Sequence, residues 1–214
     1  MLISIEGNIG SGKSTILNIL KLKYANNPHI IFLDEPVNEW DTITDTNTNQ
    51  SILQLFYQDK HKYAFTFQIL TYITRLRKIL QVLETNTNKI IITERSIYTD
   101  KFVFAKMLYQ QKLINEIEWK TYNYWFDTFR KQTKLDHIIY INTSPQNCSN
   151  RIKIRNRKGE SDISITYLQH CHTLHQQWLT NHNNTNITIL DGNIDKSILY
   201  TDPYLTPIYS LLNT

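Results

Sequence analysis

Short apolar runs alternate along the chain with longer segments of helical pattern. The apolar runs cover residues 2–6, 29–34, 89–93, 137–142 and 186–191. The segments that are long enough for helices are chiefly 13–24, 51–84, 96–131, 145–157 and 164–182. Strands that alternate with helices are typical of a parallel sheet covered on both faces. The pattern therefore predicts an α/β fold, with a five-stranded parallel sheet flanked by helices.

The 214 residues contain no repeat, linker or change of composition, so we expect a single domain over 1–214. The polar, Thr/Asn-rich segment 41–49 is predicted to be a loop. No apolar run approaches the roughly 18 residues that a membrane helix needs. The strand predicted at the first residues leaves no room for a targeting peptide. We therefore expect a cytoplasmic protein that does not bind membranes.

Composition excludes the disordered and disulfide-rich classes, because 41% of the residues are hydrophobic, 20% are charged and only two are cysteines. Cys148 and Cys171 lack CxxC spacing, which favours a reducing compartment. The net charge of +4 suits an anionic ligand but is too small to indicate nucleic-acid binding. The excess of Asn, Thr, Ile, Lys and Tyr is typical of AT-rich coding sequence, as in a virus or an AT-rich bacterium.

A phosphate-binding motif follows the first predicted strand and precedes a predicted helix, which is the context that such a motif requires. Glycines let the backbone approach phosphate oxygens, the lysine neutralises their charge, and the serine hydroxyl can bind Mg²⁺. The sequence therefore predicts a nucleoside triphosphate site. The motif reads Gly7-Asn8-Ile9-Gly10-Ser11-Gly12-Lys13-Ser14.

Carboxylates and an arginine follow the second and third predicted strands, as Asp34-Glu35 and Glu94-Arg95. Ligands of open α/β sheets bind at the carboxyl ends of the strands, so these side chains are expected around one crevice. A carboxylate there can accept a hydroxyl proton or hold a metal, and an arginine can stabilise a phosphoryl group in transfer. Alternatively, the acidic residues only cap the next helix.

Two further patterns each allow two interpretations. Gln68, Thr71 and Arg75 share one face of the helix predicted within 51–84, either a solvated face or a surface that reads a nucleobase through the bidentate amide. The basic segment 151–160 is either a solvated face or a mobile lid whose arginines close over phosphates.

Taken together, these motifs resemble the deoxyribonucleoside kinase family, which contains deoxycytidine, deoxyguanosine and insect multisubstrate deoxynucleoside kinases. The likeness spans nearly the whole chain. Its elements, in the family's order, are residues 7–15, 35–40, 57–68, 94–96, 155–160 and 167–178. The resemblance implies the fold of P-loop nucleoside and nucleotide kinases with an Arg-rich lid at about 151–162.

The resemblance also implies the reaction, which is transfer of the γ-phosphoryl group of ATP, with Mg²⁺, to the 5′-hydroxyl of a deoxynucleoside in nucleotide salvage. Glu35 would be the general base, Glu94 and Ser14 would lie at Mg²⁺, and Lys13, Arg95, Arg155 and Arg157 would stabilise charge. The implied donor-binding residues are Gly7, Asn8, Ile9, Gly10, Ser11, Gly12, Lys13, Ser14, Thr15, Arg151, Arg155 and Asp191. The implied substrate-binding residues are Glu35, Trp40, Tyr57, Phe67, Gln68, Arg75, Arg95, Asp100, Phe104 and Glu160.

Arg75 and Asp100 match an Arg and Asp pair in the deoxycytidine and deoxyguanosine kinases, where thymidine-accepting members carry apolar or small residues. The resemblance therefore implies a preference for deoxyadenosine, deoxyguanosine or deoxycytidine over thymidine, unless the two residues form only a structural ion pair. It also implies feedback by a deoxynucleoside triphosphate and a homodimer. The aromatic segment 102–129 suits the dimer interface but could equally be core.

Two other functions remain as alternatives. Thymidylate kinase, or another nucleoside monophosphate kinase, would share the P-loop, sheet and lid. However, its second-strand motif typically has an arginine ahead of Glu-Pro, where this chain has Asp34, which would repel a monophosphate. A P-loop binding protein without turnover is the second alternative. A GTPase would carry Asn-Lys-x-Asp after a strand, and the chain has no such motif.

Overall fold

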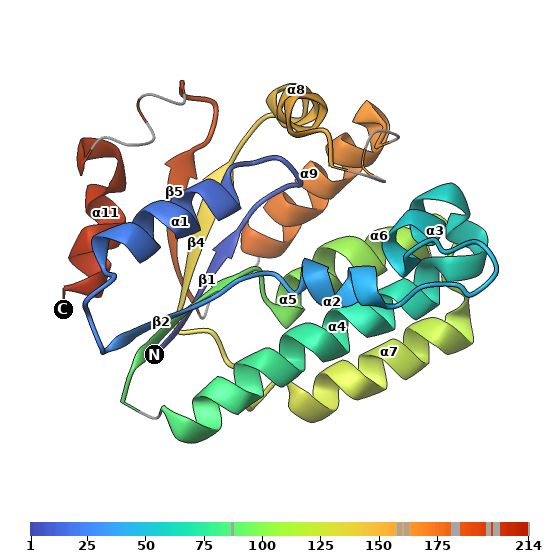
Figure 1. The fold of residues 1–214 in the computed structure, drawn as a ribbon, viewed down its shortest axis with the longest axis horizontal. Coiled ribbons are helices and arrows are strands. Elements are labelled where there is room, and N and C mark those ends of the chain that lie inside the picture. The colour runs from blue at the N-terminus through green and yellow to red at the C-terminus, as the bar shows by residue number, and fades with distance from the viewer. Residues whose placement is uncertain are drawn as a thin grey trace.

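A computed structural model describes residues 1–86, 88–157, 160, 163–180, 185–195, 198 and 202–213 (Figure 1). Its strands form one parallel sheet in the order β2-β3-β1-β4-β5. This confirms the predicted five-stranded parallel sheet, and each strand ends within one residue of its apolar run. The strands are β1 (Leu2–Glu6), β2 (Ile30–Leu33), β3 (Ile90–Glu94), β4 (His137–Asn142) and β5 (Asn186–Asp191).

The helices agree with the predicted segments except at two places. A short helix, α2, includes the first residues of the segment 41–49 that was predicted to be a loop, and α11 follows the last strand. Segment 51–84 forms two helices, because the Asp59 side chain accepts a hydrogen bond from the backbone N–H of Lys62 and starts a new helix there. The helices up to the end of that segment are α1 (Lys13–Lys23), α2 (Val37–Thr42), α3 (Ile52–Gln58) and α4 (Lys60–Thr85).

After β3 the chain forms two short α-helices that are joined by a π-helical turn, η1. π-Helical turns are rare and frequently lie at functional sites. The elements are α5 (Ile97–Thr99), η1 (Asp100–Ala105), α6 (Lys106–Gln110), α7 (Glu116–Phe129), α8 (Pro145–Arg155), α9 (Ile165–Thr180) and α11 (Asp202–Leu212). None of the helices in the described part of the chain is both long and apolar enough to cross a membrane.

Helices cover both faces of the sheet (Figure 1). Ile3 and Ile5 of β1 pack with α1 and α11 on one face, and Leu2 packs with α4, η1 and α9 on the other. Successive side chains of a strand point to opposite faces, so a strand covered on both faces is apolar throughout. This is why the central strands appear in the sequence as continuous apolar runs.

The long helix α4 also forms a third layer with α2, α3 and α7. Tyr72 of α4 and Tyr122 of α7 meet edge to face with ring centroids 5.6 Å apart. Phe126 is buried beside them, whereas Tyr124 and Trp125 of α7 remain exposed. The aromatic segment 102–129 therefore contributes in part to the core, and its exposed residues leave an apolar surface.

Stability should depend on pH through His175, which is buried in α9 with its Nδ1 2.8 Å from the carbonyl oxygen of Cys171. Burial lowers the pKa of His175 from 6.5 to about 3. Between pH 6.5 and about 3, His175 is therefore protonated in the unfolded chain but neutral in the folded chain. The free energy of unfolding decreases as pH falls through this window. Relative to His175→Phe, the wild type should lose up to about 1.4 kcal/mol of unfolding free energy per pH unit in that window.

Urea unfolding between about pH 7 and pH 5 measures this difference. His61→Gln is the matched control, because His61 lies on the exposed side of α4. Parallel pH profiles for wild type and His175→Phe would contradict the expectation.

Candidate active site

The loop between β1 and α1 has the backbone shape that close approach to phosphate requires. Gly10 and Gly12 have positive φ angles of 76° and 107°, in the left-handed region that favours glycine. A Cβ atom on Gly10 would lie 2.6 Å from the carbonyl oxygen of Cys148, so a larger residue would also clash with α8. The loop ends at the N-terminus of α1, where free backbone N–H groups attract anions.

Lys13 is a buried cation at the start of α1. Its ammonium group donates to the carbonyl oxygen of Asn8 at 2.8 Å, which folds the side chain back over the loop. Burial, and then the charge of Arg95, lowers the pKa of Lys13 to about 8. A buried ammonium group is costly without an anionic partner, so the site favours a bound anion such as phosphate.

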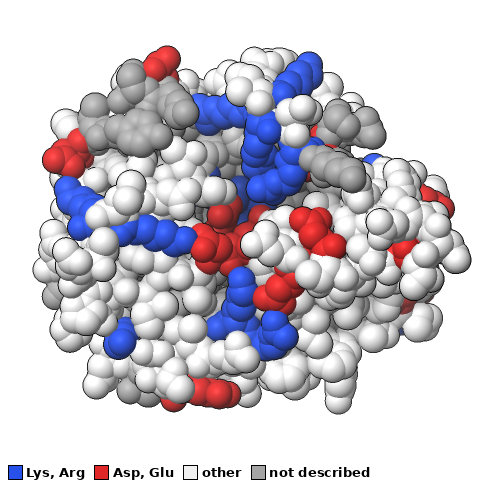
Figure 2. Space-filling model, viewed as in Figure 1, with Lys and Arg blue, Asp and Glu red and all other residues white. Residues whose placement is uncertain are grey.

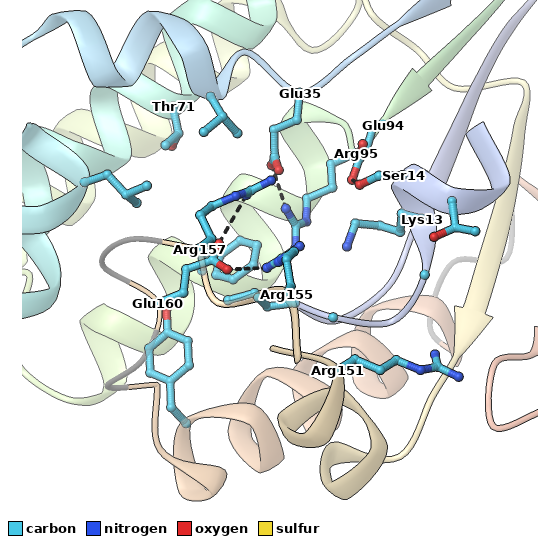
Figure 3. A pocket seen from close by; sticks show the side chains of 18 of the residues that line it. Lys13, Ser14, Glu35, Thr71, Glu94, Arg95, Arg151, Arg155, Arg157 and Glu160 are labelled. Atoms are coloured by element: carbon cyan, nitrogen blue, oxygen red, sulfur yellow. Dashed lines mark hydrogen bonds and ion pairs between the residues drawn. The ribbon is translucent and has the colours of Figure 1, made fainter. Parts of the chain in front are cut away.

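The two residues predicted to bind Mg²⁺ lie together at the end of β3. The Ser14 hydroxyl donates to Oε1 of Glu94 at 2.8 Å (Figure 3). A hydroxyl and a carboxylate beside a phosphate loop are hard oxygen ligands of the kind that Mg²⁺ prefers. The described residues contain no group of three or more His, Cys, Asp or Glu that could hold a metal. Mg²⁺ in phosphate sites usually takes most of its ligands from phosphate oxygens and water.

Glu35 lies between two guanidinium groups. Its Oε1 accepts from Nη1 of Arg95 at 2.6 Å and from Nη2 of Arg75 at 3.0 Å (Figure 3). Burial alone would raise the pKa of Glu35, but the charges of Arg95, Arg75 and Lys13 outweigh it and hold the pKa well below its usual range. The carboxylate is therefore ionised and fixed in place. Both ion pairs use the same oxygen, and no described residue bonds to Oε2, which is therefore free to accept a hydrogen bond.

Arg95 adopts an unusual backbone conformation. Its φ angle is 60°, a left-handed conformation that costs a residue other than glycine about 1–3 kcal/mol. Its guanidinium carbon lies 5.1 Å from the ring centroid of Phe104. Its Nε is buried and has no partner among the described residues. Strain and an unpaired buried donor together indicate a side chain that is held in place for a ligand.

The polar stripe on α4 faces the interior. Gln68, Thr71 and Arg75 are 3%, 5% and 2% exposed, so the interpretation as a solvated face is wrong. Nε of Arg75 donates to Oδ2 of Asp100 at 2.9 Å, which pairs the two residues as predicted. Oε1 of Gln68 is buried without a partner among the described residues, so it is free to accept a hydrogen bond from a ligand.

Aromatic rings line a slot beside this stripe. Phe67 stacks on Phe56 with ring centroids 4.7 Å apart, and Trp40 meets Phe67 edge to face at 5.6 Å. The indole N–H of Trp40 donates to the Thr74 hydroxyl at 3.0 Å, which fixes its ring. A flat apolar slot with amide and guanidinium groups along one side matches the shape and edge chemistry of a nucleobase.

One cavity of about 930 Å³ joins the slot to the phosphate loop. Figure 3 shows Lys13, Glu35 and Arg95 pointing into it, and Figure 2 shows acidic and basic side chains gathered where this face is hollowed. All of the substrate-binding residues named from the sequence line the cavity, as do Ile9, Gly10, Gly12, Lys13, Ser14, Thr15, Arg151 and Arg155.

The remaining donor-binding residues lie behind the cavity wall or beside it. Gly7, Asn8 and Ser11 are buried in the loop without lining the cavity. Asp191 is exposed, and its carboxylate accepts from the backbone and side-chain nitrogens of Asn193, both at 2.9 Å. Asn193, with Ile194 and Asp195, lines the cavity in place of Asp191.

The predicted lid is described only in part, because residues 158–159 and 161–162 lie outside the described chain. Arg155 and Arg157 both form ion pairs with Glu160 (Figure 3). Arg151 donates to the carbonyl oxygens of Ser11, at 3.1 Å, and of Gly192, at 2.8 Å. Arg151 therefore joins α8 to both the phosphate loop and the loop after β5.

Comparison with known proteins agrees with this geometry. A family model described as "Deoxynucleoside kinase" matches residues 3–202. The chain belongs to the deoxynucleoside kinase family. This kinase is 36% identical to deoxycytidine kinase 1 of Xenopus laevis over 196 residues, which cover 83% of this chain and 73% of the relative.

Two other relatives have a similar degree of likeness. The kinase is 34% identical to the mitochondrial deoxyguanosine kinase of Xenopus laevis over 195 residues, which are 83% of this chain and 72% of the relative. It is 36% identical to a probable deoxycytidine kinase of fowlpox virus over 184 residues, which are 85% of this chain and 72% of the relative. Its family, fold and site therefore all indicate a nucleoside kinase that uses ATP.

One buried carboxylate of the kinase at this edge of the sheet was not predicted from the sequence. Glu6 is the last residue of β1, is fully buried and accepts a hydrogen bond from the Ser96 hydroxyl at 2.6 Å. The available signal was an acidic residue at the end of the apolar run 2–6, directly before the glycine-rich loop. Buried carboxylates are rare and demand a physical reason.

Proposed function

We propose that this kinase transfers the γ-phosphoryl group of ATP to the 5′-hydroxyl of a deoxynucleoside, with Mg²⁺ held by Ser14 and Glu94. The observation that carries this proposal is the continuous cavity, which has the phosphate loop at one end and the aromatic slot at the other. Glu35 lies between the two ends. A nucleobase in the slot would place its sugar beside Glu35, with the 5′-hydroxyl towards the phosphates.

The residues divide the chemistry between the two substrates. Oε2 of Glu35 would accept the proton of the 5′-hydroxyl, while Mg²⁺ would supply charge stabilisation at the phosphates. Arg95, with its unpaired Nε, and Lys13 would stabilise the negative charge of the phosphoryl group in transfer. Tyr57 and Glu160, which both line the cavity, would hold the 3′-hydroxyl of the sugar.

An unphosphorylated acceptor fits the site better than a nucleoside monophosphate. Asp34, which was expected from the sequence to repel a monophosphate, does not have this role. Its side chain is 60% exposed and pairs with Lys21 outside the cavity. We propose that the repulsion comes from Glu35, whose carboxylate is ionised and would lie beside a phosphate on the acceptor. Two like charges in a buried site disfavour each other strongly.

The acceptor base would be read by Gln68, Arg75 and Asp100. A buried arginine paired with a carboxylate presents both donors and an acceptor to a base edge. The paired side chains also leave less room for the methyl group of thymine. We therefore propose that deoxyadenosine, deoxyguanosine or deoxycytidine is favoured over thymidine.

A panel of acceptors with ATP and Mg²⁺ tests the proposed reaction. We expect phosphorylation of unphosphorylated deoxynucleosides and little transfer to thymidine monophosphate, measured by product formation at steady state. Glu35→Gln should lower kcat by about 100-fold or more while ATP binding, measured by calorimetry, is retained. Transfer to the monophosphate alone would support a thymidylate kinase instead, and ATP binding without any product would support a non-catalytic binding protein.

The base preference is tested separately by the double variant Arg75→Met, Asp100→Ala. Without the polar pair, kcat/KM for thymidine relative to deoxyguanosine should rise by about 10-fold or more. The matched control is Arg77→Met, two residues further along α4, whose ion pair with Glu39 lies at the surface. An unchanged ratio would show that Arg75 and Asp100 form only a structural ion pair.

We also propose a homodimer formed through α4 and α7, which lie side by side in Figure 1. Apolar side chains are exposed on this surface, since Ile73, Ile117, Tyr124 and Trp125 are 43%, 70%, 77% and 42% exposed. Such patches are typical of interfaces. Sedimentation equilibrium should give twice the monomer mass, and Tyr124→Glu should shift the protein to monomer. A wild-type protein of monomer mass would contradict this proposal.

A further inference from the structure

Glu6 is a fully buried carboxylate that is held by hydroxyl groups. The Ser96 hydroxyl donates to Oε1 at 2.6 Å, and the Thr99 hydroxyl donates to Oε2. Burial raises the pKa of Glu6, and the Ser96 and Thr99 hydroxyls oppose that shift. The residue does not line the cavity and so does not touch the substrates directly.

Both hydroxyl groups lie on the C-terminal side of Arg95, in the turn that follows β3. Ser96 follows Arg95 directly, and Thr99 lies one helical turn further on, in α5. The backbone N–H of Arg95 also donates to the carbonyl oxygen of Ile5 at 3.0 Å, and the Thr93 hydroxyl donates to the carbonyl oxygen of Arg95 at 3.0 Å. Buried bonds therefore restrain both sides of the strained residue.

We propose that Glu6 is a positioning residue, which clamps the turn after β3 and so holds Arg95 in the left-handed conformation that aims its guanidinium at Glu35 and the transferred phosphoryl group. The inference rests on the role of Arg95 in the proposed function. A strained backbone conformation persists only when the surrounding structure restrains it. The hydrogen bonds of Glu6 with Ser96 and Thr99, which we call the clamp, supply that restraint.

A carboxylate performs this task better than an apolar residue. Its two oxygens accept from two hydroxyls at once, whereas an apolar side chain would leave both hydroxyls buried and unpaired. Glu6 is also the residue that precedes Gly7 of the phosphate loop. The same side chain therefore links the end of β1, where the phosphate loop begins, to the turn that presents Arg95.

The clamp is tested by Thr99→Val, which removes one hydroxyl and keeps the shape of the side chain. Thr133→Val is the matched control, because Thr133 is equally buried but bonds to the carbonyl oxygen of Phe129, outside the clamp. Thr99→Val should lower kcat by about 10-fold with both KM values within about 2-fold, since displaced catalytic groups cost turnover more than binding. Thr133→Val should leave kcat unchanged at a similar melting temperature.

A double-mutant cycle separates positioning from general destabilisation. Where Arg95→Ala has already removed the guanidinium, Thr99→Val should change kcat by less than about 2-fold, because its effect acts through that group. Ser96→Ala, which removes the other hydroxyl that bonds to Glu6, should behave in the same way. If one of the two clamp variants folds poorly, the other still tests the inference.

Three results would overturn the inference. Thr99→Val could leave kcat unchanged with Arg95 present, or could cause the same loss in the Arg95→Ala background, which would indicate a structural role only. In both cases the proposed function would stand, provided that Arg95→Ala itself lowers kcat. An Arg95→Ala enzyme with full activity would refute the role of Arg95, and the inference about Glu6 with it.

Discussion

The carboxylate of Glu35 lies between two buried guanidinium groups, and the active site is arranged around that interaction. Arg75 comes from α4 and Arg95 from the end of β3, while Arg75 also bonds to Asp100 at the start of η1. Buried charges are stable only when each is paired, and removing one partner typically costs about 3–5 kcal/mol. The network therefore holds together the elements at the carboxyl end of the sheet, where the substrates would meet.

This arrangement prepares the site before any ligand binds. Burial weakens the proton affinity of Lys13 and leaves Nε of Arg95 and Oε1 of Gln68 without partners in the described chain. Each of these groups costs stability in the empty protein, and each would be satisfied by phosphate or a nucleobase. The apolar clusters on both faces of the sheet and in the third layer around α4 stabilise the fold and offset this cost.

Local motifs were predictable because their chemistry depends on consecutive residues. The phosphate loop needs glycines at fixed spacing between a strand and a helix, and the strands are short apolar runs because both faces of the sheet are covered. The missed helices α2 and α11 are different. The helix α2 has only 6 residues. The helix α11 contains Pro207 in its interior, so its formation depends on packing against the rest of the protein more than on its own sequence.

The sequence by itself determined the order of strands and helices, the phosphate loop and the residue types of the site, because these follow from local patterns. Only the tertiary structure decided which polar residues face inwards. The stripe of Gln68, Thr71 and Arg75 has the same period whether it faces water or a cavity, and its burial depends on α3, β3 and η1, which pack against α4 from elsewhere in the chain. The importance of Glu6 likewise emerged only when folding brought Ser96 and Thr99 beside it, across about 90 residues of sequence.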